Sequence, residues 1–168
     1  MESADVRVYY LEMVSHCQRD LPAPSRQTMV VPVETPTVRY YRFLYDAVGR
    51  DYNWVSRNKL SDADLAEILG NPQNELLVLQ VNGSPAGFAD LNRQDHNEIE
   101  LLNFGLIPEF IGRGFGTWFL QQTINRAWSY QPRRLWLHTC TRDHPAALTT
   151  YTKAGFQEYK QETTTSSP

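Results

Sequence analysis

The chain has 168 residues, of which 41% are hydrophobic and 12% aromatic, and this suits one globular domain with a sizeable core. Its formal net charge of −3 gives no basic footprint for nucleic acid, and no apolar run approaches the ~20 residues of a membrane span. The N-terminus lacks the features of a signal peptide, and Cys17 and Cys140 are too few for a disulfide scaffold. We therefore expect one cytoplasmic domain over residues 1–168, frayed at 164–168, without a nucleic-acid or membrane partner.

The first part of the chain is predicted to form a strand and two helices. Val6–Ser15 is rich in β-branched and aromatic side chains, which is typical of a strand. Four prolines make Leu21–Pro36 extended and irregular, although its valines would allow an edge segment. Ser61 is a good N-cap and predicts a helix that continues to Leu69. Helical spacing predicts an earlier helix over Thr37–Gly49 that buries one face, consisting of Tyr40, Phe43, Leu44, Ala47 and Val48.

The second part is predicted to alternate between strands and helices. Asn82-Gly83 favours a hairpin between the strands Leu76–Val81 and Pro85–Asn92. A helix over Gly114–Tyr130 would bury a stripe consisting of Phe115, Phe119, Thr123 and Ala127. The remaining predicted elements are the strands Glu98–Ile107, Arg134–Thr139 and Phe156–Thr163 and the helix His144–Ala154.

A glycine-rich turn lies between the strand that ends near Ile107 and the helix that follows. Gly112, Gly114 and Gly116 recur at every second position, with Arg113 between the first two. Glycines allow positive φ and a close approach of the backbone to a ligand. The free N–H groups of the following helix favour an anion at its N-terminus. The stretch therefore predicts an anion site, most simply for a diphosphate.

The spacing of these glycines is neither that of a Rossmann fingerprint nor that of a P-loop. From Ile111 to Gly116 it resembles motif A of the GNAT superfamily of acyl-CoA-dependent N-acetyltransferases, Q/R-x-x-G-x-G/A, with Ile111 where Gln or Arg is usual. The preceding Leu106–Glu109 resembles the family's V-x-P-E approach to this loop.

A second match lies about thirty residues downstream. His144–Phe156 resembles the family's N-x-x-A-I-x-L-Y-x-K-x-G-F, with His144 in place of Asn. The residues in register are Ala147, Leu148, Tyr151, Lys153, Gly155 and Phe156. The whole resemblance covers about Leu76 to Glu162.

The resemblance implies the GNAT fold, an α/β architecture with a mixed, mostly antiparallel sheet of six to seven strands and helices on both faces. The fourth and fifth strands, here Glu98–Ile107 and Arg134–Thr139, would splay apart and admit acetyl-CoA as co-substrate. The residues that would then bind the coenzyme are Phe104, Leu106, Ile111, Gly112, Arg113, Gly114, Phe115, Gly116, Thr117, His144 and Ala147.

The resemblance also implies direct transfer of an acetyl group to a primary amine of a small molecule or peptide, without a covalent enzyme intermediate. Tyr151 takes the position of the family's tyrosine near the thioester sulfur, where a phenol with a pKa near ~10 could act as acid. The alternative for Tyr151 is a core tyrosine with a satisfied hydroxyl.

Glu100 matches the glutamate that serves as base in some family members. Strand alternation places it on the same face as Leu102, Phe104 and Leu106. The alternatives are a solvated glutamate or an ion pair with Arg93. Other candidates for the base are Glu98, Asp90 and an ordered water.

The acceptor pocket is expected from the first two helices and their loop, where Tyr45 and Trp54 belong to an unusually aromatic region. His138, on the splayed fifth strand, is a further candidate for the base or for contact with the acceptor, although a packed polar role is also open. The histidines lack metal-ligand spacing, so we expect no metal site.

Two other functions are compatible with the sequence. One is a non-catalytic acyl-CoA-binding sensor or interaction module on the same fold. The other, a different nucleotide-binding protein, lacks the P-loop lysine and the Rossmann spacing. Dimers are common in the family, so a homodimer is compatible with the resemblance.

Overall fold

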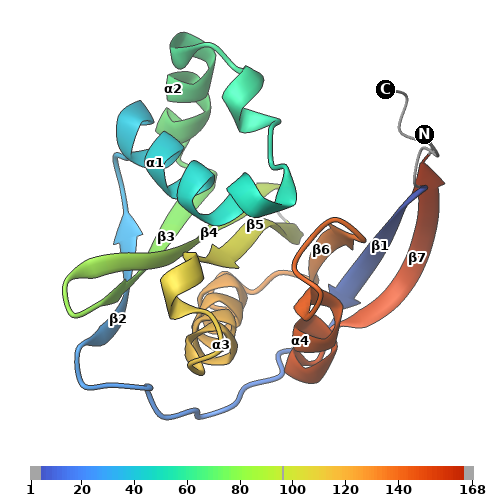
Figure 1. Ribbon diagram of the computed structural model, residues 1–168. Coiled ribbons are helices and arrows are strands. Elements are labelled where there is room, and N and C mark those ends of the chain that lie inside the picture. Colours follow the sequence, from blue (N-terminus) through green and yellow to red (C-terminus); the bar gives the residue numbers. More distant parts are fainter. Residues whose placement is uncertain (1–4, 96, 165–168) are drawn as a thin grey trace.

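The computed structural model describes residues 5–95 and 97–164, and Figure 1 shows helices packed on both faces of a twisted sheet. In these residues the sheet has seven strands in the order β2-β3-β4-β5-β6-β1-β7, and only β5 and β6 pair in parallel. The strands are β1 Val6–Met13, β2 Thr28–Val33, β3 Asn74–Val81, β4 Ser84–Asp95, β5 Glu98–Leu106, β6 Arg134–Cys140 and β7 Gln157–Thr164. The predicted mixed, mostly antiparallel sheet is confirmed.

Four α-helices cover the sheet, two on each face (Figure 1). They are α1 Val38–Gly49, α2 Asp62–Gly70, α3 Phe115–Trp128 and α4 Ala147–Ala154, with short 3₁₀ turns at η1 Arg50–Tyr52, η2 Arg57–Lys59 and η3 Pro108–Phe110. Side chains of Thr37 and Ser61 cap the first two helices, as their sequence positions favour. In the described part of the chain, none of the helices has the length and apolarity to cross a membrane.

The buried face of α1 differs from the predicted one. Phe43 is 53% exposed, whereas Tyr41 and Tyr45 are buried together with Leu44 and Val48. The tyrosines can be buried because their hydroxyls have partners, Asp90 for Tyr41 and Ser56 for Tyr45. Hydrophobic periodicity alone favoured Phe43 because it takes no account of such partners.

The N-terminal strand lies inside the sheet and not at its edge. β1 pairs antiparallel with both β6 and β7 and separates them, while β2 lies at the opposite edge of the sheet. The connection between β1 and β2, residues 14–27, must therefore cross the molecule, and Figure 1 shows it running past the lower end of α3. We call residues 14–27 the crossing segment.

Two of the sequence predictions concern the edges of the structure. The valines of the proline-rich region do form an edge strand, β2, which pairs with β3 alone among the described strands. Pro32 has no N–H to donate, and a proline is tolerated in an edge strand because one side of that strand needs no ladder hydrogen bonds. The tail predicted to be frayed comprises residues 164–168. Thr164 is the last residue of β7, and residues 165–168 lie outside the described residues.

Gly105 of β5 packs so closely under α1 that it has no room for a side chain. A Cβ at this position would lie 2.4 Å from Cγ1 of the buried Val48. We expect Gly105→Ala to lower the free energy of unfolding by roughly 1–3 kcal/mol, because the overlap must push strand and helix apart. Urea unfolding would measure this change.

Gly70, at the end of α2, is the matched control because a Cβ there would meet nothing within 4 Å. Gly70→Ala should raise stability slightly or leave it unchanged, by at most about 1 kcal/mol. Equal stability of Gly105→Ala and the parent protein would contradict the close packing of β5 against α1.

Candidate functional site

A cavity of about 580 Å³ lies where β5 and β6 diverge. The two strands pair only from Glu98 to Glu100 and from Arg134 to Trp136, so the predicted splay is present. The cavity also reaches the start of α3, the start of α4 and the loop after α1. The predicted site residues that line it are Tyr45, Trp54, Phe104, Leu106, Ile111, Gly112, Gly114, Gly116, Thr117, His138, His144, Ala147 and Tyr151.

The glycine-rich turn forms one end of this cavity. Gly112 and Gly114 have φ values of 78° and 85°, in the left-handed region that favours glycine. Gly114 is the N-cap of α3 and has no side chain that could accept a hydrogen bond from the first-turn N–H groups. These N–H groups therefore remain available to a ligand. Such an arrangement is suited to hold an anion.

Two predicted coenzyme-binding residues do not line the cavity. Phe115 is 3% exposed and packs edge-on against Phe110, with ring centroids 5.9 Å apart. Arg113 lies over the rings of both phenylalanines and donates to the Glu109 carbonyl at 3.5 Å. The turn thus directs both side chains away from the space between the strands.

Tyr151 of α4 lies at the wall of the cavity, with its ring packed edge-on against Phe104 and Phe156 at centroid distances of 6.2 and 6.0 Å. Its side chain is only 8% exposed. Burial, assisted by the negative charge of Asp143, raises the pKa of the Tyr151 phenol above its usual value. The hydroxyl is therefore protonated at neutral pH.

Glu100 does not line the cavity but contacts a residue that does. Its Oε1 lies 3.3 Å from Nδ1 of His138, whose ring borders the cavity. This hydrogen bond raises the pKa of the His138 imidazole, with partial burial acting in the opposite direction. The alternative ion pair with Arg93 does not occur, because Arg93 pairs instead with Glu75 at 3.8 Å.

The predicted face of Glu100 is wrong because β5 contains a bulge. Asp90 pairs with Asn103 but Leu91 pairs with Leu101, so Leu102 has no partner in the ladder and the alternation reverses. Leu101 and Phe104 consequently contribute to the same core, on the side of α3. Glu100 points to the other face, where it meets His138.

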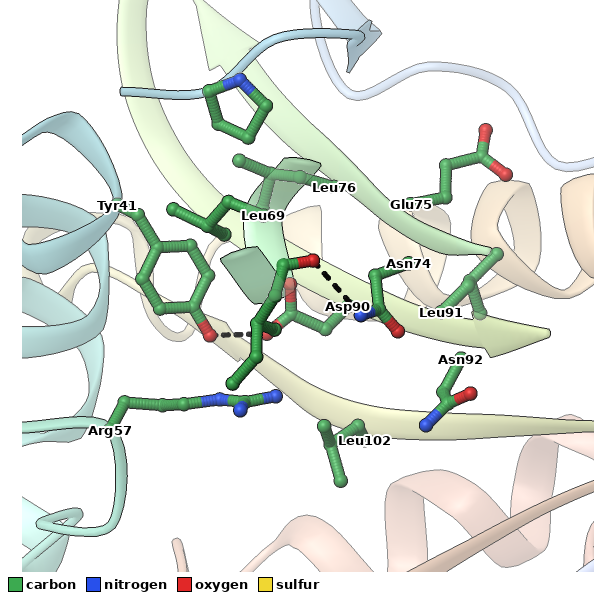
Figure 2. Close-up of a pocket in the computed structure, with 12 residues that line it drawn as sticks. Tyr41, Arg57, Leu69, Asn74, Glu75, Leu76, Asp90, Leu91, Asn92 and Leu102 are labelled. Atoms are coloured by element: carbon green, nitrogen blue, oxygen red, sulfur yellow. Dashed lines mark hydrogen bonds between the residues drawn. The ribbon is translucent and has the colours of Figure 1, made fainter. Parts of the chain in front are cut away.

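A buried network on the α1 side holds the bulge in place. Asp90 accepts hydrogen bonds from the Tyr41 hydroxyl at 2.6 Å and from the Asn103 amide at 2.8 Å. Figure 2 shows Asp90 between Tyr41 and Asn74, with Arg57 alongside. The cleft beside them holds only about 10 Å³, room for about one water. This network is too cramped for a substrate and fixes β5 at its bulge.

Asp143 is a central residue that the sequence analysis missed. It accepts hydrogen bonds from Trp54 Nε1 at 3.1 Å, from Thr139 Oγ1 at 2.7 Å and from the Cys140 N–H at 2.8 Å. It thereby joins the loop after α1 to the end of β6 and borders the cavity. No sequence motif indicated its link to the loop after α1, because Trp54 is 89 residues away.

The remaining wall of the cavity is mainly aromatic and polar. The ring of Tyr45 is tilted by 46° to that of Trp54, with centroids 5.6 Å apart, and Tyr52 packs edge-on with His144 at a centroid distance of 5.9 Å. His144 Nδ1 accepts a hydrogen bond from the Ala146 N–H at 3.0 Å, which fixes its ring at the start of α4. Among the described residues, no group of three or more His, Cys, Asp or Glu side chains could hold a metal ion.

The sequence and the structure both resemble known acetyltransferases. The pattern of the acetyltransferase (GNAT) family matches residues 41–156. Uncharacterised N-acetyltransferases of Mycobacterium bovis and Mycobacterium tuberculosis are 30% identical over 98 residues, 58% of this chain. The matched part spans 62% of the length of these relatives, less than two thirds.

Solved structures share the fold at low sequence identity. A GNAT acetyltransferase from Elizabethkingia anophelis with acetyl-CoA bound has a TM-score of 0.57 at 20% identity, over 79% of this chain and 78% of its own. An aminoglycoside acetyltransferase from an uncultured soil sample has a TM-score of 0.63 at 17% identity, over 79% of this chain and 93% of its own. A GCN5-related N-acetyltransferase from Sphaerobacter thermophilus has a TM-score of 0.62 at 16% identity, over 93% of this chain but only 49% of its own.

The splayed strands, the glycine turn and the tyrosine of α4 all lie inside the matched region. Because the family pattern covers well over half of the sequence, the chain belongs to the acetyltransferase (GNAT) family.

Proposed function

We propose that the protein transfers the acetyl group of acetyl-CoA to a primary amine of a small molecule or peptide. The observation that carries this proposal is the single cavity that joins the glycine turn to Tyr151 and His138. The glycine turn is suited to a diphosphate, and the same cavity is lined by two groups that could act on the amine and on the thioester sulfur. The bound acetyl-CoA of the Elizabethkingia anophelis relative supports the choice of co-substrate.

The coenzyme would enter along the gap between β5 and β6. Its diphosphate would accept hydrogen bonds from the N–H groups at the start of α3, after Gly114. Beyond Glu100 the facing edge of β5 is not paired with β6, so its backbone groups at Phe104 and Leu106 could bind the pantetheine amides as another strand would. This path leads the thioester toward Tyr151.

The reaction needs a neutral amine, because an ammonium has no lone pair. Only His138 of the Glu100–His138 pair lines the cavity, so we assign proton removal to His138 Nε2 and orientation of the ring to Glu100. The amine nitrogen then attacks the thioester carbon, and a C–N bond forms. The nitrogen loses its remaining extra proton to solvent as the C–S bond breaks, and the coenzyme leaves as a thiolate that accepts a hydrogen bond from the Tyr151 hydroxyl.

The acceptor would approach from the side of the loop after α1. Trp54 is held there by Asp143, and Tyr45 and His138 complete an aromatic and polar wall. Aromatic faces favour a cation or an apolar ring next to the reacting amine. This wall gives Tyr45, Trp54 and His138 the proposed role of acceptor contacts.

Calorimetry with acetyl-CoA, followed by an assay of thiol release across polyamines, amino acids, aminoglycosides and lysine peptides, tests the proposal. Absence of acetyl-CoA binding at millimolar concentration rejects it. Binding without thiol release for any acceptor would favour the non-catalytic sensor instead.

The turn itself can be tested with a pair of glycine variants. We expect Gly114→Ala to weaken acetyl-CoA binding about tenfold, because an alanine at φ 85° costs about 1–2 kcal/mol and the turn relaxes to avoid it. Gly83→Ala is the control, since Gly83 has a similar φ of 81° and open space around a Cβ, but lies in the hairpin between β3 and β4 and does not line the cavity. Calorimetric dissociation constants that rise equally in both variants would contradict the special role of Gly114.

Tyr151→Phe removes the hydroxyl and keeps the ring packing. We expect kcat to fall by about 10²-fold while the dissociation constant of acetyl-CoA stays within about twofold, because the hydroxyl acts on the leaving sulfur. Tyr159→Phe, at an exposed tyrosine of β7, should leave both quantities unchanged. Unaltered turnover in Tyr151→Phe would remove this residue from the mechanism.

The Glu100–His138 pair predicts a change in the pH profile. The hydrogen bond from Glu100 raises the pKa of His138, and the base is active only when deprotonated, so kcat/KM rises as pH increases through that pKa. Glu100→Gln should lower the pKa and move the acid limb of the profile to lower pH.

NMR titration of the His138 ring gives a second readout that does not depend on activity. The control is Glu67→Gln, an exposed position on α2. If the acid limb and the His138 titration both stay where they are in the parent protein, the proposed pair is refuted.

A further inference from the structure

A second pocket, of about 190 Å³, adjoins the main cavity between α3, α4 and the crossing segment. Thr117, Ala146 and Thr150 line both spaces, so the two are neighbours at the N-termini of the two helices. Thr117 belongs to the first turn of α3, where the diphosphate is proposed to bind. A group attached to that diphosphate could therefore reach the second pocket.

The charged side chains that line this pocket are all positive. Among the described residues that line it, Arg19 and Lys153 carry the charged side chains, and the other polar groups are threonine hydroxyls and Gln121. Within residues 5–95 and 97–164, no ion pair or hydrogen bond involves the Arg19 or the Lys153 side chain. Two cations without partners, beside hydroxyl donors and without a carboxylate, favour an anion.

The crossing segment is held in place on both sides of Arg19. The indole N–H of Trp118 donates to the Leu21 carbonyl at 3.2 Å, and the amide of Gln121 donates to the Cys17 carbonyl at 3.0 Å. Gln121 is 2% exposed, so its hydrogen bond is shielded from water. Side chains of α3 thus fix the backbone that carries Arg19 at the edge of the pocket.

The strand order explains why the crossing segment, which carries Arg19, lies beside this pocket. Because β1 lies between β6 and β7 while β2 is at the far edge, the chain must pass α3 and α4 on its way between them. Arg19 lies near the middle of that passage. Lys153, on α4, lines the same pocket.

We propose that this pocket binds a phosphate monoester at the end of the acyl carrier remote from the thioester, with Arg19 and Lys153 as its cations. In coenzyme A this group is the phosphate on the ribose, which is joined to the diphosphate. The site would select coenzyme A over carriers that lack this phosphate. The inference rests on the proposed function and adds a specificity-determining residue, Arg19, from outside the matched family region.

The test compares calorimetric dissociation constants for acetyl-CoA and 3′-dephospho-acetyl-CoA. The parent protein should bind acetyl-CoA about tenfold more tightly. Arg19→Gln and Lys153→Gln should each weaken acetyl-CoA binding roughly two- to fivefold, the range expected for partly exposed charge pairs, and leave the dephospho ligand unaffected. Arg19→Lys should recover part of the loss.

Arg39→Gln is the matched control, because it removes the same charge from an exposed position on α1. It should leave the ratio of the two dissociation constants unchanged. Thermal unfolding of each variant reports whether the crossing segment remains folded.

Several outcomes would overturn the inference. Equal affinity of the parent protein for both ligands would do so, as would an equal loss for both ligands in Arg19→Gln. A third contrary outcome combines two results: inorganic phosphate binds through Arg19, and the parent protein binds acetyl-CoA and its dephospho form equally. The pocket would then bind phosphate from a source other than coenzyme A. Failure of both ligands to bind the parent protein at millimolar concentration would instead reject the proposed function.

Discussion

The separation of β5 and β6 after only three paired residues is the constraint on which the site depends. Two strands that part in the middle of a sheet leave backbone N–H and C=O groups without partners, which is costly unless another group pairs with them. The other neighbours of these strands prevent the gap from closing. β4 and the Asp90 network hold β5, and β1 pairs with β6 along nearly its full length.

The placement of β1 has two structural consequences. It supports the outer side of β6 and gives β7 a partner, since β6 and β7 are not neighbours in the sheet. It also requires the crossing segment, which α3 fastens through Trp118 and Gln121. A single choice of strand order thereby supports the gap between β5 and β6 and supplies a wall of the neighbouring pocket.

Local features of the site were predictable from the sequence, and long-range ones were not. The turn around Gly114 follows from backbone conformation, which neighbouring residues determine. The position of β1 depends on pairing with strands more than 120 residues away, and nothing within Val6–Met13 encodes that choice. The face of Glu100 was predicted wrongly because one extra residue at Leu102 reverses strand alternation. Asp143 was missed because its link to the loop after α1 depends on Trp54, 89 residues away in the sequence.

Tyr151 and His138 both have raised pKa values, but the causes differ, and this separates their proposed roles. Burial keeps Tyr151 neutral, whereas the Glu100 carboxylate makes His138 the stronger base. A thiol has a pKa near ~8.5, below that of a phenol, so complete proton transfer from Tyr151 to a departing thiolate would be unfavourable. Tyr151 is therefore better suited to stabilise the developing negative charge through a hydrogen bond. The buried position favours this role, because a hydrogen bond to a charged sulfur is stronger where water is excluded.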